Sequence, residues 1–267
     1  MNRNNLIMYS VGIIAVVIAA LWFAQTGSKS GSNLSAYDNL QVPASLLSQL
    51  HIPSQEFAQV GIGASAGNLP KAIASNITLS LDNKTEILYI GADYCPYCAA
   101  ERWPLVIALS RFGNFTKLYY MTSSAQDYAP STPTFSFHNS TYTSDYISFV
   151  GVETQENKLV NGVYGVLQNP DPQQLAVLSK FNYQGGIPFI DFGNVSVIRG
   201  ATYDPMLLQG KTWSEIAASL SDANSTISQS ILGSANLITA AICNADGNQP
   251  AGVCSQNYIQ QLEKNIH

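Results

Sequence analysis

The chain has 267 residues, of which 46% are hydrophobic, 10% are aromatic and only 11% are charged, and its formal net charge is −5. With 12 Lys and Arg in all, it has no basic patch able to neutralise a run of phosphates, so nucleic acid is excluded as an expected partner. The aromatic and aliphatic content can build a hydrophobic core, which excludes a disordered chain. The length suits one large domain, or one domain with insertions.

The first residues predict a membrane anchor. Residues 6–24 carry no charge, and a helix of that length nearly crosses the hydrocarbon core of a bilayer, which is about 30 Å thick. Arg3 on the short side favours a cytoplasmic N-terminus. The alternative, a cleaved signal peptide, would put Trp22 where a small residue is expected. We therefore expect residues 1–24 to form a cytoplasmic tip and one transmembrane helix, with the rest of the chain extracytoplasmic.

Residues 25–40 are rich in Gly, Ser and Asn and predict a flexible linker, which leaves residues 41–267 as the extracytoplasmic domain. The chain also carries seven Asn-x-Ser/Thr sequons, about twice the number expected by chance, which suits an external glycoprotein. The candidate glycosylation sites are Asn33, Asn76, Asn83, Asn114, Asn139, Asn194 and Asn224.

Hydrophobic periodicity and turn residues predict an α/β domain. In chain order we expect a helix at 44–50, a hairpin with strands at 77–81 and 86–90, a helix at 95–112, a strand at 117–122, a β-rich insertion at about 124–169, a helix at 171–181, a hairpin with strands at 188–192 and 195–199, and helices at 212–220 and 226–243. The strand at 86–90, the helix at 95–112 and the strand at 117–122 make a predicted β-α-β unit.

The motif Cys95-Pro96-Tyr97-Cys98 lies where a predicted strand gives way to a predicted helix. Cys95 then falls at the N-cap and Pro96 at the first helical position. The unpaired amides and the positive end of the helix dipole favour a thiolate at Cys95. Such a thiolate attacks a disulfide, and Cys98, one turn further along, resolves the mixed disulfide. The spacing therefore predicts a redox-active pair.

The motif has two alternative interpretations, a zinc site and a structural disulfide. A tetrahedral zinc site needs a second close pair of Cys or His, whereas Cys243 and Cys254 are separated by ten residues and the three histidines are scattered. An inert structural disulfide is the other alternative, but a Cys-x-x-Cys ring is small and strained for that purpose. We expect no metal site.

The motif and its surroundings resemble the thioredoxin superfold. The resemblance rests on the strand, the CPYC at a helix start, Trp103-Pro104 in that helix, and Gly185-Gly186-Ile187-Pro188 before a hairpin. The phrases YIGADYCPYCAAERW and AAICNADGNQPAGVC also resemble an uncharacterised, largely archaeal family of membrane-anchored thioredoxin-like proteins, over roughly residues 40–260. The resemblance implies a thioredoxin-like fold with a β-rich insertion, and a cis peptide before Pro188 facing the cysteines. It implies no particular substrate.

The chain departs from the thioredoxin pattern at one position. Many thioredoxins carry a buried acid six residues before the first cysteine, and Tyr89 stands there in this chain. Proton transfer to and from Cys98 then needs another group. Asp93 and Glu101 are the nearest candidates, and the alternative for each is a solvated charge at a helix end.

The second pair, Cys243 and Cys254, brackets a loop with Gly and Pro turn formers. A disulfide that closes such a loop lowers the conformational entropy of the unfolded chain and so stabilises the fold by about 3 kcal/mol. A structural disulfide is therefore the favoured interpretation. The alternatives are a second redox centre that relays electrons to or from the first pair, and free thiols or a metal site.

Together these features predict a membrane-anchored, extracytoplasmic thiol–disulfide oxidoreductase without a cofactor. Cys95 attacks, Cys98 resolves, Pro188 shapes the substrate groove, and Pro96 and Tyr97 complete the motif. Expected partners are client proteins with thiols or disulfides, a candidate membrane redox partner, and lipid through the anchor. The alternatives are a non-catalytic thioredoxin-like binding module and a reductant for external thiols, as in cytochrome c maturation.

Overall fold

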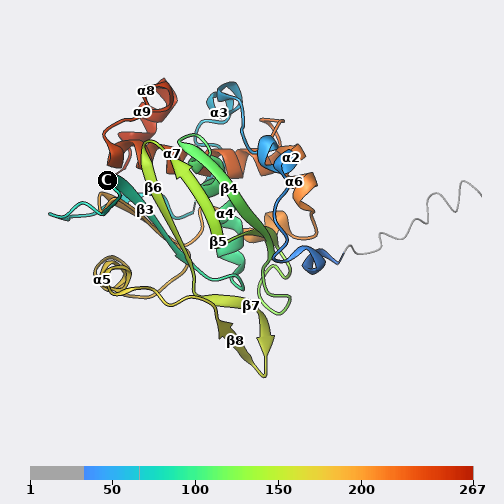
Figure 1. The fold of residues 1–267 in the computed structure, drawn as a ribbon. Helices are drawn as coiled ribbons and strands as arrows, with labels where there is room; N and C mark the ends of the chain where they lie inside the picture. The colour runs from blue at the N-terminus through green and yellow to red at the C-terminus, as the bar shows by residue number, and fades with distance from the viewer. Residues whose placement is uncertain (1–32, 66, 267) are drawn as a thin grey trace, which may run out of the picture. The chain divides into compact units, whose positions relative to one another are not determined.

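A mixed β-sheet with helices on both faces organises residues 33–65 and 67–266, the part of the chain that this computed structural model describes (Figure 1). Its elements in chain order are η1 (Leu34–Tyr37), α2 (Ala44–Gln49), α3 (Ser54–Val60), β1 (Lys71–Ala72), β2 (Ser80–Leu81), β3 (Lys84–Gly91), α4 (Pro96–Leu109), β4 (Gly113–Thr122), β5 (Pro133–Ser144), β6 (Ile147–Glu153), β7 (Gln155–Val160), β8 (Val163–Val166), α5 (Pro172–Phe181), β9 (Phe189–Phe192), β10 (Ser196–Arg199), η2 (Pro205–Leu208), α6 (Trp213–Ser219), α7 (Thr226–Asp246), α8 (Ala251–Cys254) and α9 (Asn257–Glu263), where η marks a 3-10 helix.

Strand β3 lies at the centre of this sheet. It pairs in parallel with β6 and antiparallel with β9, so that Leu88 lies opposite Val150 on one side and Asp191 on the other. The predicted hairpin of β9 and β10 is confirmed, and the short strand β1 extends the sheet beyond β10. The predicted hairpin before it is confirmed as β2 and β3, although β2 is shorter than predicted.

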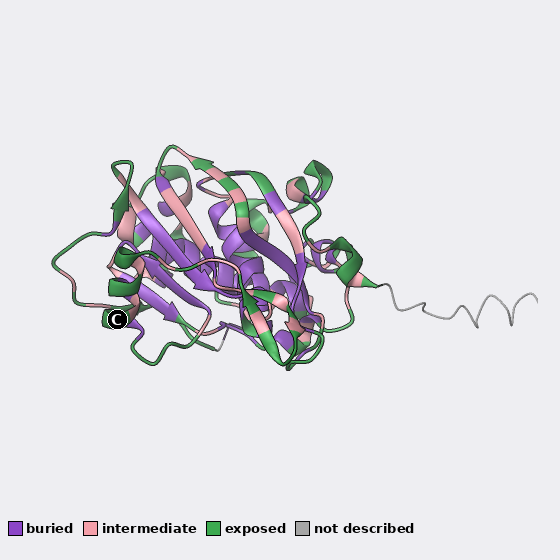
Figure 2. Cartoon of the chain, turned by 60° about the horizontal axis from the view of Figure 1, so that its bottom comes forward, coloured by how far each residue is buried: buried purple, intermediate pink, exposed green. Residues whose placement is uncertain are grey.

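The side chains of β3 alternate between two hydrophobic layers, as the pleat of a strand requires. Ile87 and Tyr89 pack on one face, in the main core that also holds the buried residues of α4 and α7. Leu88 and Ile90 pack on the other face against α5. Because β3 is buried on both faces, its sequence is a continuous apolar run. Figure 2 shows buried residues filling the centre of the sheet.

Local chemistry sets the start of several helices. The helix predicted at 171–181 is confirmed as α5: Asp171 caps it by accepting a hydrogen bond from the backbone N of Gln174, and Pro172 occupies the first helical position. The predicted helices at 44–50, 95–112, 212–220 and 226–243 are confirmed as α2, α4, α6 and α7. Helices α3, α8 and α9 were not predicted, because each is short and has a weak periodic pattern.

The predicted β-α-β unit is wrong in its second strand. The strand predicted at 117–122 is confirmed as β4, but it pairs antiparallel with β5. The parallel partner of β3 is β6, which lies inside the region 124–169 expected to be an insertion. Apolar alternation identifies a strand but not its neighbour, since pairing depends on tertiary packing. The parts of this region outside the central sheet are the β4–β5 ladder and the β7–β8 hairpin.

Residues 34–40, predicted as the end of the linker, fold against the domain instead. The ring centroid of Tyr37 lies 5.7 Å from that of Trp213, and the Asp38 carboxylate accepts a 2.8 Å hydrogen bond from the backbone N of Thr122. These contacts are tertiary, so a polar local composition could not reveal them. The rest of the predicted linker and the predicted anchor at 6–24 lie outside the described residues.

Helix α7 is the one described helix long and apolar enough to cross a membrane, by length and composition alone. However, 89% of its most apolar window is buried inside the domain. Its apolar surface is therefore covered by the protein's own core, which identifies it as a core helix.

Candidate functional site

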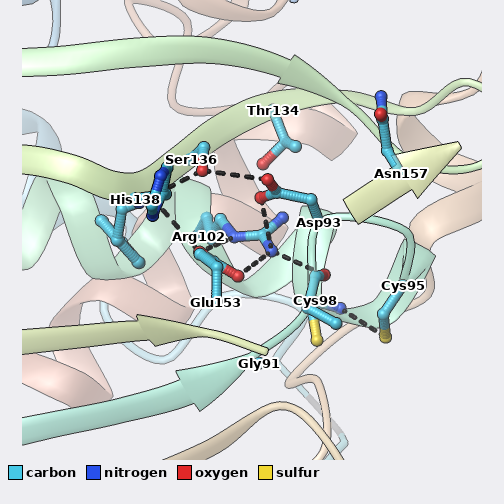
Figure 3. Close-up of polar contacts among 12 residues, drawn as sticks. Gly91, Asp93, Cys95, Cys98, Arg102, Thr134, Ser136, His138, Glu153 and Asn157 are labelled. Carbon is cyan, nitrogen blue, oxygen red and sulfur yellow. Dashed lines mark hydrogen bonds and ion pairs between the residues drawn. The ribbon is translucent and has the colours of Figure 1, made fainter. Parts of the chain in front are cut away.

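Cys95 and Cys98 lie at the start of α4, just after the central strand β3 ends (Figure 3). Cys95 is the N-cap residue with an extended backbone, and its Sγ accepts a 3.3 Å hydrogen bond from the backbone N of Cys98. Pro96 occupies the first turn, as predicted. Both thiols are free, with Cys95 5% exposed and Cys98 fully buried. The strand-to-helix junction therefore sets one sulfur near the surface and the other behind it.

The two thiols differ in acidity. The hydrogen bond from the Cys98 side chain lowers the pKa of Cys95, and the nearby charge of Arg102 acts in the same direction. Burial raises the pKa of Cys98 well above its ordinary value, and its hydrogen bond to Cys95 adds to the rise. Cys95 is thus the group that ionises first, and the Cys98 thiol donates a hydrogen bond to it.

Pro188 lies on the segment that faces these thiols. The peptide bond between Ile187 and Pro188 is cis, as the resemblance implied, and Ile187 packs against the buried cluster of Ala92, Cys95 and Cys98. The carbonyl O of Pro188 accepts a 2.7 Å hydrogen bond from the backbone N of Gly200. The structure therefore brings the predicted proline segment and the predicted cysteine pair together.

A buried ion pair supports the cysteine pair from inside. Arg102 of α4 donates from Nε and Nη2 to the two carboxylate oxygens of Glu153, at 2.9 and 2.6 Å, and Nη2 also donates to the backbone O of Ala92 at 2.7 Å. Arg102 and Glu153 are both fully buried. This two-point contact joins the first turns of α4 to the end of β6, the strand beside β3.

Asp93 joins this ion pair. Its Oδ1 lies 3.5 Å from Arg102 Nη2, and its Oδ2 accepts a hydrogen bond from the Ser136 hydroxyl at 3.2 Å, as Figure 3 shows. Burial, with help from the charge of Glu153 and against that of Arg102, raises the pKa of Asp93 to about 8. Near neutral pH this carboxyl can therefore both hold and release a proton.

Glu101, the other candidate for proton transfer, contacts Thr202 instead of Arg102. It is fully buried, and its Oε2 accepts hydrogen bonds from the backbone N and the hydroxyl of Thr202, both at 2.8 Å. Burial raises its pKa to about 8, against the effect of these hydrogen bonds. The structure thus separates the two candidates: Asp93 contacts Arg102, whose charge acts on both thiols, and Glu101 holds the loop after β10.

Sequence reasoning missed the ion pair of Arg102 and Glu153. The available signal was Arg102 within a helix that is otherwise almost wholly apolar, because a charge at such a position needs a buried partner. It also missed two stacked tyrosine pairs beside the motif. Tyr94 stacks on Tyr164 with ring centroids 4.1 Å apart, and Tyr97 stacks on Tyr128 at 5.8 Å.

The predicted bond between Cys243 and Cys254 is present in the structure. Both residues are fully buried, and they belong to the main hydrophobic core with Ile259 and Leu262. The bond joins the last turns of α7 to α8. Within the described residues, no group of three or more His, Cys, Asp or Glu side chains could hold a metal ion.

The candidate glycosylation sites are nearly all accessible. Six of the seven asparagines are exposed, and Asn194 is half-buried. The side-chain amide of Asn194 donates to the backbone O of Ile77 at 3.0 Å, so its nitrogen is engaged in the fold. Asn194 is therefore the least suited of the seven to carry a glycan.

Comparison with known proteins places the chain in a family. Residues 70–244 match the profile of a domain of unknown function, DUF929. The chain belongs to this family. The matched segment contains the cysteine motif, Glu153, Pro188 and Cys243. Neither the curated proteins nor the solved structures gave a significant match.

Proposed function

We propose that this DUF929 protein is a thiol–disulfide oxidoreductase with a thioredoxin-like fold, acting on protein disulfides through Cys95 and Cys98. The observation that carries the proposal is the difference between the two thiols: Cys95 caps α4 with a lowered pKa, and Cys98 lies fully buried behind it with a raised one. This is the arrangement that an attacking thiolate and a resolving thiol require.

The topology supports the fold assignment. The four principal strands of the sheet run in the order β6-β3-β9-β10, with β6 parallel to β3 and the other neighbours antiparallel. Helix α4 follows β3, α5 precedes β9, and α7 comes after β10. This arrangement keeps the features on which the resemblance to the thioredoxin superfold rests, a strand that leads into the CPYC helix and a cis proline before a hairpin, and adds the β4–β5 ladder and the β7–β8 hairpin to them.

The reaction follows from the two thiols. The Cys95 thiolate attacks one sulfur of a client disulfide, forms a mixed disulfide with it, and releases the other client sulfur as a thiolate. Cys98 then passes its proton to the Asp93 carboxylate, and its sulfur attacks Cys95 Sγ. The Cys95–Cys98 disulfide forms, the second client thiolate leaves, and two electrons have moved to the client. The reverse sequence oxidises a client dithiol.

Trapping tests the proposal. The Cys98→Ser full chain should accumulate mixed disulfides with clients, because Cys95 attacks but nothing resolves the product. The Cys95→Ser chain, which keeps a buried cysteine, should form none. Alkylation of Cys95 should also follow a pKa below the roughly 8.5 of a free cysteine. An ordinary titration curve for Cys95, with no trapped client, would favour a non-catalytic binding module instead.

We also propose that the domain is extracytoplasmic and tethered by residues 6–24. The uncharged run, Arg3 on its short side and the seven sequons support this placement. Protease added to intact cells should digest the domain, and a carbonate wash should leave it on the membrane. Release of the intact domain by the wash would exclude the anchor.

A further inference from the structure

A cavity of about 490 Å³ opens beside the cysteine motif. Tyr97, the residue immediately before Cys98, forms one wall, and the segment from Gly200 to Asp204 forms another. Ala64 and Leu207 add apolar surface. Cavities of this size hold one or two side chains of a bound polypeptide or a small ligand.

The cavity lies next to the candidate redox site. Its wall begins at Gly200, whose backbone N donates to the carbonyl O of Pro188, and the adjoining Ile187 packs against Cys95. On the other side Tyr97 belongs to the motif itself. A polypeptide whose disulfide lies at Cys95 would therefore bring the residues next to its cysteine to this cavity.

Two residues that line the cavity, Tyr97 and Asp204, are both in contact with Tyr128. Tyr97 and Tyr128 stack with their ring planes 15° apart, and both remain nearly half exposed, at 44% and 46%. The Tyr128 hydroxyl donates to both carboxylate oxygens of Asp204, at 3.2 and 3.1 Å. The stacked rings and the carboxylate are thus held next to one another.

Asp204 gives the cavity a single sign of charge. It is the only Asp, Glu, Lys or Arg among the described residues that line the cavity. Its oxygens accept hydrogen bonds from Tyr128 and from the backbone N of Met206, and the ion pairs found among the described residues all involve Arg102. Among the described residues, therefore, no cation lies within ion-pair distance of this carboxylate.

We infer that this cavity receives a Lys or Arg side chain of the client polypeptide, next to the client cysteine that Cys95 attacks. The aliphatic stem of such a side chain matches the apolar wall, and its cationic end reaches Asp204 and the faces of the tyrosine rings. An acidic side chain would meet repulsion from Asp204, and a neutral one would gain no ionic contact. The inference rests on the proposed function and adds a client preference to it.

The experiment uses the full chain carrying Cys98→Ser, so that the mixed disulfide with Cys95 accumulates. Symmetric disulfide dimers of short peptides, identical except for Lys, Gln or Glu beside the cysteine, are mixed with it, and the mixed disulfide is quantified by mass spectrometry. Each rate is divided by the rate of the same peptide with a small neutral thiol, which removes the peptide's intrinsic reactivity. We expect the normalised rate of the Lys peptide to exceed that of the Gln peptide by about two- to fivefold, which is the effect of an exposed ionic contact. The normalised rate of the Glu peptide should be below that of the Gln peptide.

Asp204→Asn keeps an acceptor for Tyr128 and for the backbone N of Met206, and should bring the Lys-to-Gln ratio to about one. Asp145→Asn is the control: it removes an exposed carboxylate in the turn between β5 and β6 and should leave the Lys-to-Gln ratio unchanged. Equal rates for the three peptides, or a Lys preference that survives Asp204→Asn, would overturn the client preference and leave the oxidoreductase standing. No mixed disulfide with any peptide would overturn both proposals.

Discussion

The two cysteine pairs of this chain are almost equally buried and chemically opposite. Cys243 and Cys254 are bonded to each other inside an apolar core, whereas Cys95 and Cys98 are free thiols at the start of a helix. The two pairs hardly differ in solvent exposure, since Cys95 is 5% exposed and the other three cysteines are fully buried. The surroundings make the difference: the charge of Arg102 acts on both thiols of the first pair.

The comparison shows that burial alone does not make a cysteine inert. In the first pair, burial raises the pKa of Cys98 well above its ordinary value, while the contact with Cys98 lowers that of Cys95. The helix start then places the more acidic sulfur nearer the surface, with the less acidic one behind it. The second pair, eleven residues apart in sequence, closes a loop at the end of a helix and restricts the unfolded chain.

Removing the ion pair behind the first pair should have the largest effect. Arg102→Met leaves the buried carboxylate of Glu153 without its partner, and breaking such a pair costs about 3–5 kcal/mol. We expect this loss in the free energy of unfolding in urea, together with a higher pKa for Cys95. The double variant Arg102→Met/Glu153→Leu should recover part of the loss, because the fully buried Glu153 carboxylate is then gone as well and Asp93, whose raised pKa lets it take up a proton, is the carboxyl left without Arg102. Equal losses in the single and double variants would contradict this account.

Removing the second pair should affect stability alone. Replacing Cys243 and Cys254 with Ser should lower the free energy of unfolding by about 3 kcal/mol, equivalent to about 6–12 °C in melting temperature for a domain of this size. Exchange at Cys95, measured by insulin reduction, should hardly change. A variant that melts like the wild type but no longer turns over would instead identify the second bond as an electron relay.

The first pair could be predicted because its chemistry is local. A Cys-Pro-Tyr-Cys motif after an apolar strand fixes the N-cap, the proline position and the order of the two thiols within a few residues. The cap of α5 by Asp171 and the hairpin of β9 and β10 are local in the same sense. Each depends on neighbours that the sequence displays side by side.

The remainder of the site depends on contacts far apart in the chain. Glu153 reaches Arg102 only because β6, and not β4, lies beside β3. Tyr128 reaches Asp204 across a separation of 76 residues. Strand pattern does not specify which strand will pair with β3, so the sequence indicated the thiols and Asp93 but not the groups that hold them.

Acidification should stabilise the domain. Within the described part of the chain, seven carboxyl groups have a clearly shifted pKa, and burial raises it in every one of them, to about 8 for Asp93 and Glu101. Such a group holds its proton more tightly in the folded chain. Its contribution is therefore complete below its unfolded pKa, near 4, and is lost as the pH rises through the folded value.

We accordingly expect the free energy of unfolding, read from urea melts, to fall between pH 5 and pH 8. A single carboxyl group with a folded pKa of about 8 contributes on the order of 3 kcal/mol to this fall, and both Asp93 and Glu101 are such groups. Because Asp93 lies beside the first cysteine pair and titrates in this interval, Asp93→Asn should flatten the profile. The contribution of the Cys243–Cys254 bond, which carries no titrating thiol, should be the same at both pH values. Stability that rises from pH 5 to pH 8 would contradict the assigned carboxyl pKa shifts.

The last prediction separates the proton acceptor from the residues that merely surround it. If Asp93 takes the proton of Cys98, Asp93→Asn should slow the resolving step on the order of 10²-fold, or about 2.7 kcal/mol of barrier, and leave the attack by Cys95 much less affected. In the wild type the resolving rate should rise with pH toward about 8, as the Asp93 carboxyl loses its proton, and the variant should lack this inflection. Stopped-flow decay of a preformed mixed disulfide measures the step directly. Asp191→Asn is the matched control: Asp191 is a buried strand aspartate whose pKa is also raised by burial, to about 6, but its carboxylate accepts from the backbone N of Asn194 in the β9–β10 turn. If both variants slow the step equally and both keep the inflection, the effect is structural and Asp93 is not the acceptor.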